Sequence, residues 1–297
     1  MLDCYQLFLH LALNSNFKTM KTFFFFVLLI SIFIIGCEES SSSFSYEKQI
    51  VVNGLLESGH SIDSIKLSYT AEVDKKYIPS NYAITNAVVR VIGVDVIFDD
   101  TLIHDVQNPG RYYSADSTKI ILPTKTYRLD IKTQDGKSVS ATTTVPDTFS
   151  IVYSSIVNNS TVQYNTGLPV NFFSWTPSKF QGTYLPTISS IESAVPRIPK
   201  SYIRDTTSGP PPDKITYRVG LPKDQTHTEL PWIVLNYYGK TRFDVFAIDE
   251  NYNRFLNQFV ASQGGELREI QYNISGGIGS FGSRTQAKGG ITANIIP

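Results

Sequence analysis

Residues 126–145 read TYRLDIKTQDGKSVSATTTV, and this stretch predicts a β-hairpin. Over residues 126–133, apolar and polar residues alternate, which is typical of a half-buried strand with one apolar face: Tyr127, Leu129 and Ile131. Asp135-Gly136 is a dipeptide favoured in two-residue hairpin turns. Residues 137–145 then form the returning strand, which ends before Pro146 because proline cannot donate a ladder hydrogen bond.

The segments before this hairpin extend the β-pattern towards the N-terminus. From Ile65 onward, apolar residues again fall at every second position, and Asn108-Pro109-Gly110 is a turn signal. Strands are expected at residues 49–56, 62–70, 86–93, 94–98 and 111–113. Short strands with frequent turns favour a β-sandwich over residues 47–146. The order AVVRVIG, GRYYS and TYRLDIKTQDGKSVSATTTVP resembles the transthyretin-like or carboxypeptidase-regulatory type of immunoglobulin-like (Ig-like) module.

Residues 147–297 predict a second β-rich domain, so the expected fold class is all-β. Repeated proline between residues 186 and 231 indicates an extended excursion with one short strand at 215–219, because proline breaks both helices and ladders. A loop of this length is either functional or mobile. The remaining strands of this domain are expected at residues 169–175, 232–238, 241–248, 267–274 and 289–296.

One amphipathic helix is expected over residues 249–263. Asp249 suits the N-cap position, and Gly264-Gly265 suits the C-terminal stop. The apolar residues recur with helical spacing and form a single stripe: Tyr252, Phe255, Leu256, Phe259 and Val260.

The N-terminal residues are expected to form an export signal rather than a folded element. Residues 23–35 read FFFFVLLISIFII, which is short for a membrane-spanning helix but right for the apolar core of a signal peptide. Ile34-Ile35-Gly36-Cys37 resembles a bacterial lipobox, so residues 1–36 are expected to be removed and Cys37 to be lipidated. The alternative is an ordinary secretory signal with a chance cysteine. Met20 looks like a more natural start than Met1, because residues 1–19 add a polar stretch before the apolar core.

Processing at Cys37 removes Lys18, Lys21 and Asp3, leaving 24 basic and 25 acidic residues. This balance argues against nucleic-acid binding, which needs a positive excess. Attachment to a membrane would therefore come from lipid rather than from charge. Residues 37–46 are Ser-rich and predict a flexible tether. Glu38-Glu39 either resembles the surface-export signal of Bacteroidota lipoproteins or is part of a solvated linker.

Candidate chemical sites are weak, so we expect no catalytic residue, metal or cofactor. The glycines of SGGIGSFGS miss the dinucleotide spacing and indicate a bulged strand or a turn where backbones approach closely: Gly276, Gly277, Gly279 and Gly282. Three residues match the opening of a calcium loop, but the expected helix accounts for them as cap and solvated face: Asp249, Asn251 and Asn253.

The other titratable candidates are scattered along the sequence. Asp99 and Asp100 are adjacent, so on a strand they point to opposite faces and cannot form one dyad. The three histidines of the processed chain are far apart and lack metal-ligand spacing: His60, His104 and His227.

Two tyrosine pairs, Tyr112-Tyr113 and Tyr237-Tyr238, lie in expected strands, where one member of each pair must face outward. We favour cross-strand aromatic packing for them, with a sugar- or protein-binding surface as the alternative.

The order of these features resembles the Bacteroidota lipoprotein family called domain of unknown function 4249. The features are the lipobox, IVVNGLLESG, TYRLDI followed by ATTTVP, the Tyr-containing helix and ISGGIGSFGS. The resemblance implies an outer-membrane accessory lipoprotein without established activity, of a kind often encoded near TonB-dependent receptors.

Three functional hypotheses follow. The first is a non-enzymatic, membrane-anchored binding component whose partner is such a receptor and whose small-molecule or glycan ligand is unknown. The alternatives are a carbohydrate-active hydrolase, which needs two carboxylates in one cleft, and an adhesin or structural surface subunit.

Overall fold

The hairpin predicted over residues 126–145 is present in the computed structural model. β6 (Thr126–Lys132) pairs antiparallel with β7 (Ser138–Thr144) along its whole length. Tyr127 and Leu129 are fully buried. Gly136 has a φ of 83° in the connecting turn, a conformation that favours glycine. The predicted hairpin is confirmed.

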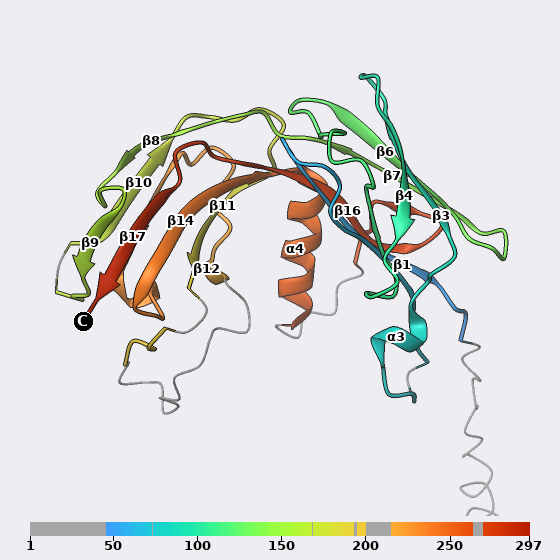
Figure 1. Ribbon diagram of the computed structural model, residues 1–297, viewed down its shortest axis with the longest axis horizontal. Coiled ribbons are helices and arrows are strands. Elements are labelled where there is room, and N and C mark those ends of the chain that lie inside the picture. The colour runs from blue at the N-terminus through green and yellow to red at the C-terminus, as the bar shows by residue number, and fades with distance from the viewer. Residues whose placement is uncertain (1–45, 73, 168, 193–194, 200–214, 264–269) are drawn as a thin grey trace, which may run out of the picture. The chain divides into compact units, whose positions relative to one another are not determined.

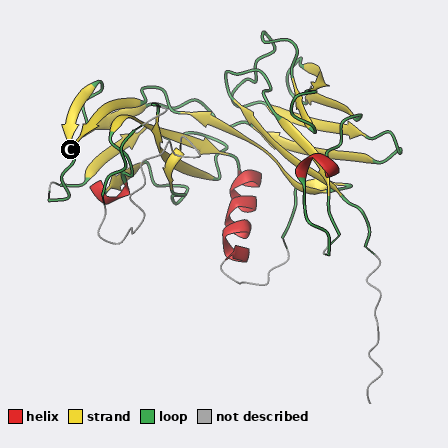
Figure 2. Cartoon of the chain, turned by 60° about the horizontal axis from the view of Figure 1, so that its bottom comes forward, coloured by secondary structure: helices red, strands yellow, loops and turns green. Residues whose placement is uncertain are grey.

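The structure describes residues 46–72, 74–167, 169–192, 195–199, 215–263 and 270–297. Lys48–Pro297 forms one compact unit, while Met1–Glu47 is a separate unit of which only Tyr46 and Glu47 are described. Strands are the main regular secondary structure of the described residues (Figure 2). No helix among the described residues is long and apolar enough to cross a membrane, and the apolar run at 23–35 lies outside them.

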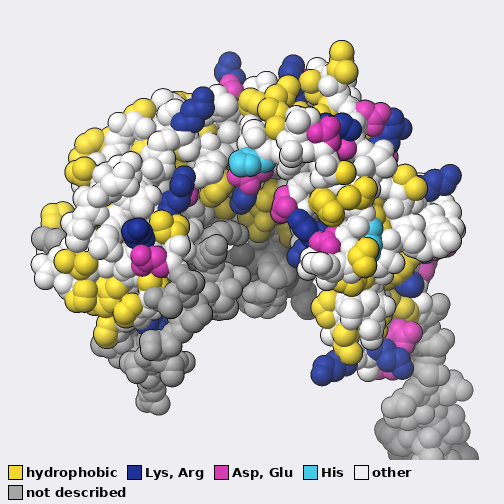
Figure 3. All heavy atoms as spheres, in the orientation of Figure 1, with side chains coloured by type: hydrophobic (Ala, Val, Ile, Leu, Met, Phe, Trp, Pro, Cys, Tyr) yellow, Lys and Arg dark blue, Asp and Glu magenta, His cyan; other side chains and the backbone are white. Residues whose placement is uncertain are grey.

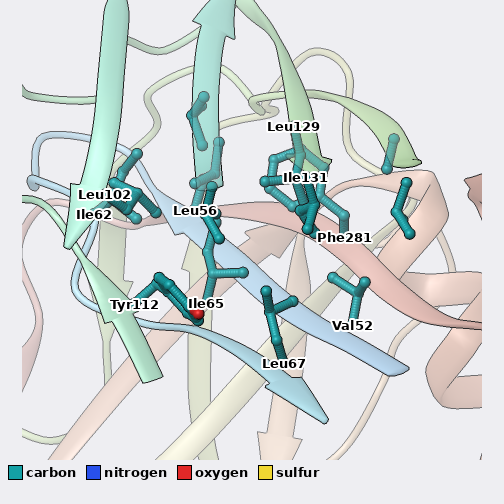
Figure 4. Packing of buried hydrophobic residues seen from close by; sticks show 14 of the residues in the cluster. Val52, Leu56, Ile62, Ile65, Leu67, Leu102, Tyr112, Leu129, Ile131 and Phe281 are labelled. Carbon is teal, nitrogen blue, oxygen red and sulfur yellow. The ribbon is translucent and has the colours of Figure 1, made fainter. Parts of the chain in front are cut away.

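The first core cluster lies between two groups of strands. β1 (Ile50–Glu57), β2 (Ile65–Tyr69) and β5 (Arg111–Tyr113) form one group, and β3 (Val88–Gly93), β6 and β7 form the other. β4 (Asp99–His104) pairs with β3 at its start and with β5 at its end, so it joins the two groups. Figure 4 shows the buried side chains of both groups packed together, among them Val52, Leu67 and Leu129.

Two C-terminal strands complete this first cluster. β16 (Ile278–Gln286) runs parallel to β1 from Val51↔Ile278 to Glu57↔Arg284, and β15 (Ile274–Ser275) pairs with β7. Phe281 and Ile274 are buried members of the cluster. Residues after 147 therefore supply part of the core around residues 50–145. The predicted division into domains 47–146 and 147–297 stays a prediction.

The second core cluster is rich in aromatic residues. A three-stranded sheet has the order β13 (His227–Leu230), β10 (Asn171–Trp175) and β8 (Ile151–Ser154). The cluster joins its inner face to β11 (Thr183–Ser190), β14 (Gly239–Ile248) and β17 (Ile291–Ile296). β9 (Ser160–Gln163) extends β17, and β12 (Ile215–Arg218) extends β11. The largest buried rings come from several strands and one short helix: Phe173, Trp175, Tyr184, Trp232 and Phe243.

The predicted helix is confirmed as α4 (Glu250–Gln263). Tyr252 and Leu256 pack against a small cluster of Leu185, Phe246 and Ile248 on β11 and β14. The helix thus covers a face of the strands that bridge the two larger clusters (Figure 1).

Several predicted strands are wrong. Residues 94–97 form a turn that the Gly93 N–H closes by donating to the Phe98 carbonyl at 2.8 Å, and a strand begins only at Asp99. Within 232–238, η1 (Trp232–Val234) is a 3-10 helix, because the Trp232 indole turns inward and donates to the Pro169 carbonyl. In the predicted strand 267–274, residues 270–273 are irregular and only Ile274 is extended, while 267–269 lie outside the described residues.

The predicted excursion over 186–231 is also wrong in part, because β11 and β13 occupy some of it. Pro186 sits inside β11, paired with Val245 of β14. The Pro186 carbonyl accepts from the Val219 N–H at 3.5 Å, so both the carbonyl and the nitrogen of Pro186 face β12 rather than β14. The β11–β12 ladder ends at Arg218, before it would need an N–H from Pro186. The missing N–H therefore removes no bond to β14. The short strand expected at 215–219 is confirmed as β12, and residues 200–214 lie outside the described residues.

Candidate functional site

The strongest candidate site is a polar groove on the outward face of β1 and β2. Because strand residues alternate between faces, burial of Val52 and Leu56 turns Asn53 and Glu57 outward. The β1–β2 register places Lys66 opposite Asn53, and the β1–β16 register places Arg284 beside Glu57. These side chains line a cavity of about 600 Å³, together with residues of the loop after β1: His60, Ser61, Asp63 and Ser64.

A second cavity of about 730 Å³ adjoins the first. The two share Asp63, Ser64 and Lys66, so they form one continuous surface, which we call the β1–β2 groove. The far part of the groove is lined by Arg111 and by residues of α3 (Pro79–Tyr82) and the β4–β5 turn. Its lining is polar and carries both signs of charge.

At one end of the groove, Arg284 is held in place by two neighbours. Its Nε and Nη2 donate to the same oxygen of Glu57 at 3.0 and 2.6 Å. Its guanidinium lies 4.5 Å from the centre of the Phe246 ring, a cation–π contact. The ion pair leaves little positional freedom to either side chain.

At the other end, Arg111 bridges two carboxylates. Its Nη1 donates to Asp105 at 2.7 Å, and its Nη2 donates to the Asp63 carboxylate at 2.7 Å and to the Asp63 carbonyl at 2.8 Å. Hydrogen bonds from Asn108 and from Arg111 lower the pKa of Asp105 to about 2. Asp105 therefore stays ionised at any physiological pH and keeps Arg111 oriented.

Lys66 lies where the two cavities meet. Within the described part of the chain, no ion pair to Lys66 is present, whereas the neighbouring carboxylates of Glu57 and Asp63 are each held by an arginine. An ammonium without an ion pair among the described residues suits a ligand that carries an anionic or strongly hydrogen-bonding group. The arrangement can bind and orient such a group.

Burial raises the pKa of the Asp249 carboxyl. A carboxyl group with a raised pKa is a candidate general acid only where it lies in a cleft. Asp249 is 2% exposed and lines neither cavity of the groove.

Asp249 instead joins α4 to β7 and β16. One carboxylate oxygen accepts from the backbone N–H groups of Tyr252 at 3.2 Å and Ser283 at 3.0 Å. The other oxygen accepts from the Thr143 hydroxyl at 2.8 Å, and that hydroxyl also lies 2.7 Å from the Ser283 hydroxyl. The predicted N-cap role is confirmed. The contacts to Thr143 and Ser283 were missed, because those residues lie 106 and 34 positions away.

The calcium-like residues lie in this helix, as predicted. Asn251 donates to the Thr142 carbonyl at 3.0 Å and Asn253 to the Gly182 carbonyl at 3.4 Å, so both tie α4 to neighbouring segments. The glycines also have the structural role expected of them. A Cβ atom on Gly279 would lie 2.0 Å from the Val52 carbonyl oxygen, and one on Gly282 would lie 2.6 Å from the Tyr252 Cβ.

The scattered titratable residues stay apart. Asp99 is exposed and Asp100 is buried, which confirms that they face opposite sides of β4. His60 lines the groove, His104 accepts from the Gly110 N–H at 3.2 Å, and His227 lies against Phe172. No group of three or more potential metal ligands occurs in the described ranges.

The two tyrosine pairs behave differently. Tyr112 is buried and donates to the Ile84 carbonyl at 3.0 Å, whereas Tyr113 is half-buried beside Arg111. This confirms the prediction that one member faces outward. Tyr237 and Tyr238 lie outside any strand, and both are half-buried. Tyr238 contacts Tyr164 edge-on at 6.2 Å.

Sequence reasoning missed the groove, because its residues come from separated segments. Glu57 and Arg284 are 227 positions apart and meet only through the parallel β1–β16 pairing. The signal available in the sequence was weak: charged residues at outward positions of alternating strands. The proposed lipidation site, Cys37, lies outside the described residues.

The comparisons with known proteins add a family and distant structural neighbours. The family described as domain of unknown function (DUF4249) matches residues 37–289. No curated protein matches the chain.

Among solved structures, similar chains include the FN1–FN3 domains of chicken CNTN1, at 12% identity and a TM-score of 0.27. That match covers 67% of this chain and 60% of the CNTN1 chain. A two-domain fibronectin type III segment of chicken tenascin matches at 13% identity and a TM-score of 0.21, covering 68% of this chain and 92% of that one. The IG1+IG2 structure of DIP-gamma matches at 9% identity and a TM-score of 0.21, covering 85% and 99%.

Proposed function

Because the chain belongs to the DUF4249 family, which carries no assigned function, we propose from its own features that it is a lipid-anchored envelope protein. In this proposal Cys37 carries the lipid, residues 38–46 are the tether, and the β-rich body binds a ligand or a partner. The body begins with an Ig-like, transthyretin-like sandwich. The protein acts as a binding or accessory component and not as an enzyme.

The observation that carries this proposal is a coincidence at Cys37. The apolar run of residues 23–35 ends just before Gly36-Cys37, and the family match begins at Cys37 itself. The first strand, β1, starts at Ile50, so a short tether separates the cysteine from the folded body. An export signal, a cysteine and a tether in this order are what a lipoprotein requires.

The membrane we propose is the outer membrane of a Bacteroidota cell, and the proposed partner is a TonB-dependent receptor. The near-equal numbers of basic and acidic residues after Cys37 support anchoring by lipid rather than by charge. The β1–β2 groove supplies the binding surface, since Lys66 lines both of its cavities and has no ion pair among the described residues.

The anchor is tested by fractionation of cells that express Cys37→Ser. We expect the substituted protein to leave the membrane fraction, while the parent chain stays in it. Cys4→Ser is the matched control, because the chain has only two cysteines and Cys4 precedes the proposed cleavage point. Unchanged membrane association of Cys37→Ser would overturn the proposal.

The partner is tested by crosslinking membranes and purifying the tagged full chain. We expect a receptor to co-purify, and Lys66→Glu to weaken its recovery more than Lys125→Glu, a cation outside the groove. If the protein repeatedly comes out alone, the receptor proposal fails.

A further inference from the structure

The segment Lys75–Tyr82 displays aromatic and aliphatic side chains beside lysines. Tyr77 is 51% exposed and Ile78 is 44% exposed. The rings of Tyr77 and Tyr82 stack with their centres 5.3 Å apart. α3, which ends this segment, buries none of its residues. Exposed tyrosine, isoleucine and lysine together are typical of a surface that meets a membrane interface.

This segment begins next to the point where the tether enters the folded body. The Thr70 N–H donates to the Gln49 carbonyl at 3.0 Å, and the Gln49 N–H donates to the Thr70 hydroxyl at 3.1 Å. The Lys48 ammonium lies 3.6 Å from the centre of the Tyr69 ring. The chain therefore reaches β1 at the end of β2, only a few residues before Lys75. Figure 1 shows α3 at this end of β1.

The length of the tether keeps this end of the body close to its anchor. Eleven residues, 38–48, separate Cys37 from Gln49. Fully extended, these residues span at most about 40 Å. A lipid on Cys37 would hold the tether-bearing end of the body nearest the bilayer.

We propose that Lys75–Tyr82 contacts the bilayer in which the Cys37 lipid is anchored. This inference rests on the proposed function, because it needs the lipid at Cys37. Tyr77 and Ile78 enter the headgroup region, and Lys76 remains at lipid phosphates. A lipid chain combined with a second, protein-borne contact binds a membrane more firmly than the lipid chain alone.

The charges at this end explain which lysine is available. Lys75 lies 3.9 Å from Glu72 and 3.7 Å from Asp74, so two carboxylates surround it. No ion pair to Lys76 is found among the residues the structure describes. Because the carboxylates of Glu72 and Asp74 offset the charge of Lys75, the contact depends on the apolar side chains more than on charge. Figure 3 shows hydrophobic side chains beside both signs of charge in the region of α3.

A control position, Ile97, follows the end of β3 that lies away from the tether. Val88, at the start of β3, lies opposite Lys132. Lys137, beyond the turn that follows Lys132, donates to the Lys48 carbonyl at 3.2 Å, so this is the tether-bearing end of the strand. Gly93 ends β3 at the turn that carries Ile97, which is aliphatic like Ile78 and fully exposed. A membrane contact at α3 would leave Ile97 in water.

The test places one reporter at each end of the lipidated full chain. Ile78→Cys and Ile97→Cys are each labelled with an environment-sensitive dye and reconstituted into vesicles of phosphatidylethanolamine and phosphatidylglycerol that carry a quencher lipid. We expect quenching at position 78 to be about two-fold or more above that at position 97, since interfacial side chains enter the headgroup boundary. As a label-free check, vesicle-bound protein should resist trypsin after Lys76, while the Cys37→Ser protein in solution should be cut there.

The outcomes separate the two proposals. Protein that floats with the vesicles but shows equal quenching at both positions overturns the membrane contact and leaves the anchor standing. Protein that fails to float overturns the anchor itself. Trypsin cleavage after Lys76 at equal rates in vesicle-bound and Cys37→Ser protein would also overturn the contact.

Discussion

The two core clusters differ in the kind of side chain that fills them. The first packs mainly aliphatic side chains from short alternating strands, with Tyr112, Tyr127 and Phe281 as its buried rings. The second packs aromatic rings such as Phe173 and Trp175, from strands separated by proline-containing segments. Alternating aliphatic strands can be recognised locally, whereas an aromatic cluster takes its rings from irregular segments as well. The clusters are nevertheless joined, because β16 carries Phe281 into the first cluster and pairs with β14 of the second.

The largest expected loss of stability comes from a substitution at Gly279, in the strand β16 that the two clusters share. Its φ is 112°, and a Cβ atom would lie 2.0 Å from the Val52 carbonyl oxygen. We expect Gly279→Ala to lower the free energy of unfolding by about 3 kcal/mol or more, because strain and a backbone clash add. Gly136→Ala is the control: φ is also positive there, but no atom lies within 4 Å, so about 1 kcal/mol is expected. Urea unfolding measures both, and equal losses would contradict the clash.

The substitution Leu129→Ala tests whether the two clusters unfold in one cooperative transition. Leu129 is fully buried in the first cluster, whereas both tryptophans, Trp175 and Trp232, lie in the second. We expect tryptophan fluorescence to report a loss of about 2–5 kcal/mol, because the shared β16 couples the clusters. Val88→Ala, at a 59% exposed position on β3, should change stability by less than about 0.5 kcal/mol. An unchanged fluorescence midpoint in Leu129→Ala would mean that the clusters unfold separately.

Substitution of Asp249, which joins α4 to β7 and β16, is expected to cause a smaller loss of stability that depends on pH. Asp249→Ala should cost about 1–3 kcal/mol, because Tyr252, Ser283 and Thr143 lose their acceptor. Burial raises the pKa of Asp249 above its usual 3.8, so the native state holds the proton more tightly than the unfolded state does. Its contribution to stability is therefore largest below that usual value, and it falls as the pH rises through the raised pKa.

Asp249→Asn separates the charge from the cap. Asparagine also accepts at an N-cap but does not ionise, so we expect it to flatten this part of the pH dependence. Urea unfolding at a series of pH values compares the parent chain with both variants. A pH dependence that persists unchanged in Asp249→Asn would assign it to another group.

The smallest expected effect concerns Glu57 and Arg284 at the groove. Both side chains are partly exposed, at 23% and 28%, so solvent screens their attraction. A double-mutant cycle with Glu57→Gln and Arg284→Gln should give a coupling of about 0.5–1 kcal/mol that shrinks with added salt. A coupling as large as the Gly279 effect would show that this ion pair, rather than the backbone ladder, joins β1 to β16.

The errors of sequence prediction follow the same contrast between the clusters. In the first cluster the sequence predicts the hairpin of β6 and β7 to within one residue at each strand end, because alternation and the Asp135-Gly136 turn are local signals. The failure there was 94–98, where alternating apolar residues belong to a tight turn closed by Gly93. In the second cluster Pro186 argued against a strand, yet it occupies a ladder position that needs no donor.

The candidate site shows how far local reasoning reaches. Lys66 lies between Ile65 and Leu67 in a segment that the sequence predicts as a strand, and burial of these two neighbours turns Lys66 outward. Nothing local indicated that Arg284 would meet Glu57 or that Arg111 would meet Asp63, since each pair joins distant segments. Charges at outward positions become a groove only when strand order brings them together.

The amino-acid sequence by itself determined the β-character of the chain, the main hairpin, the position and cap of α4, and the structural role of the glycine-rich strand. These features depend on contacts between residues close in sequence, or on conformations that only glycine adopts. The tertiary structure decided the parallel pairing of β1 with β16, the burial of Asp249 between three elements and the assembly of the groove. Those features depend on which distant segments become neighbours, and that is set by the packing of the whole core rather than by any local pattern.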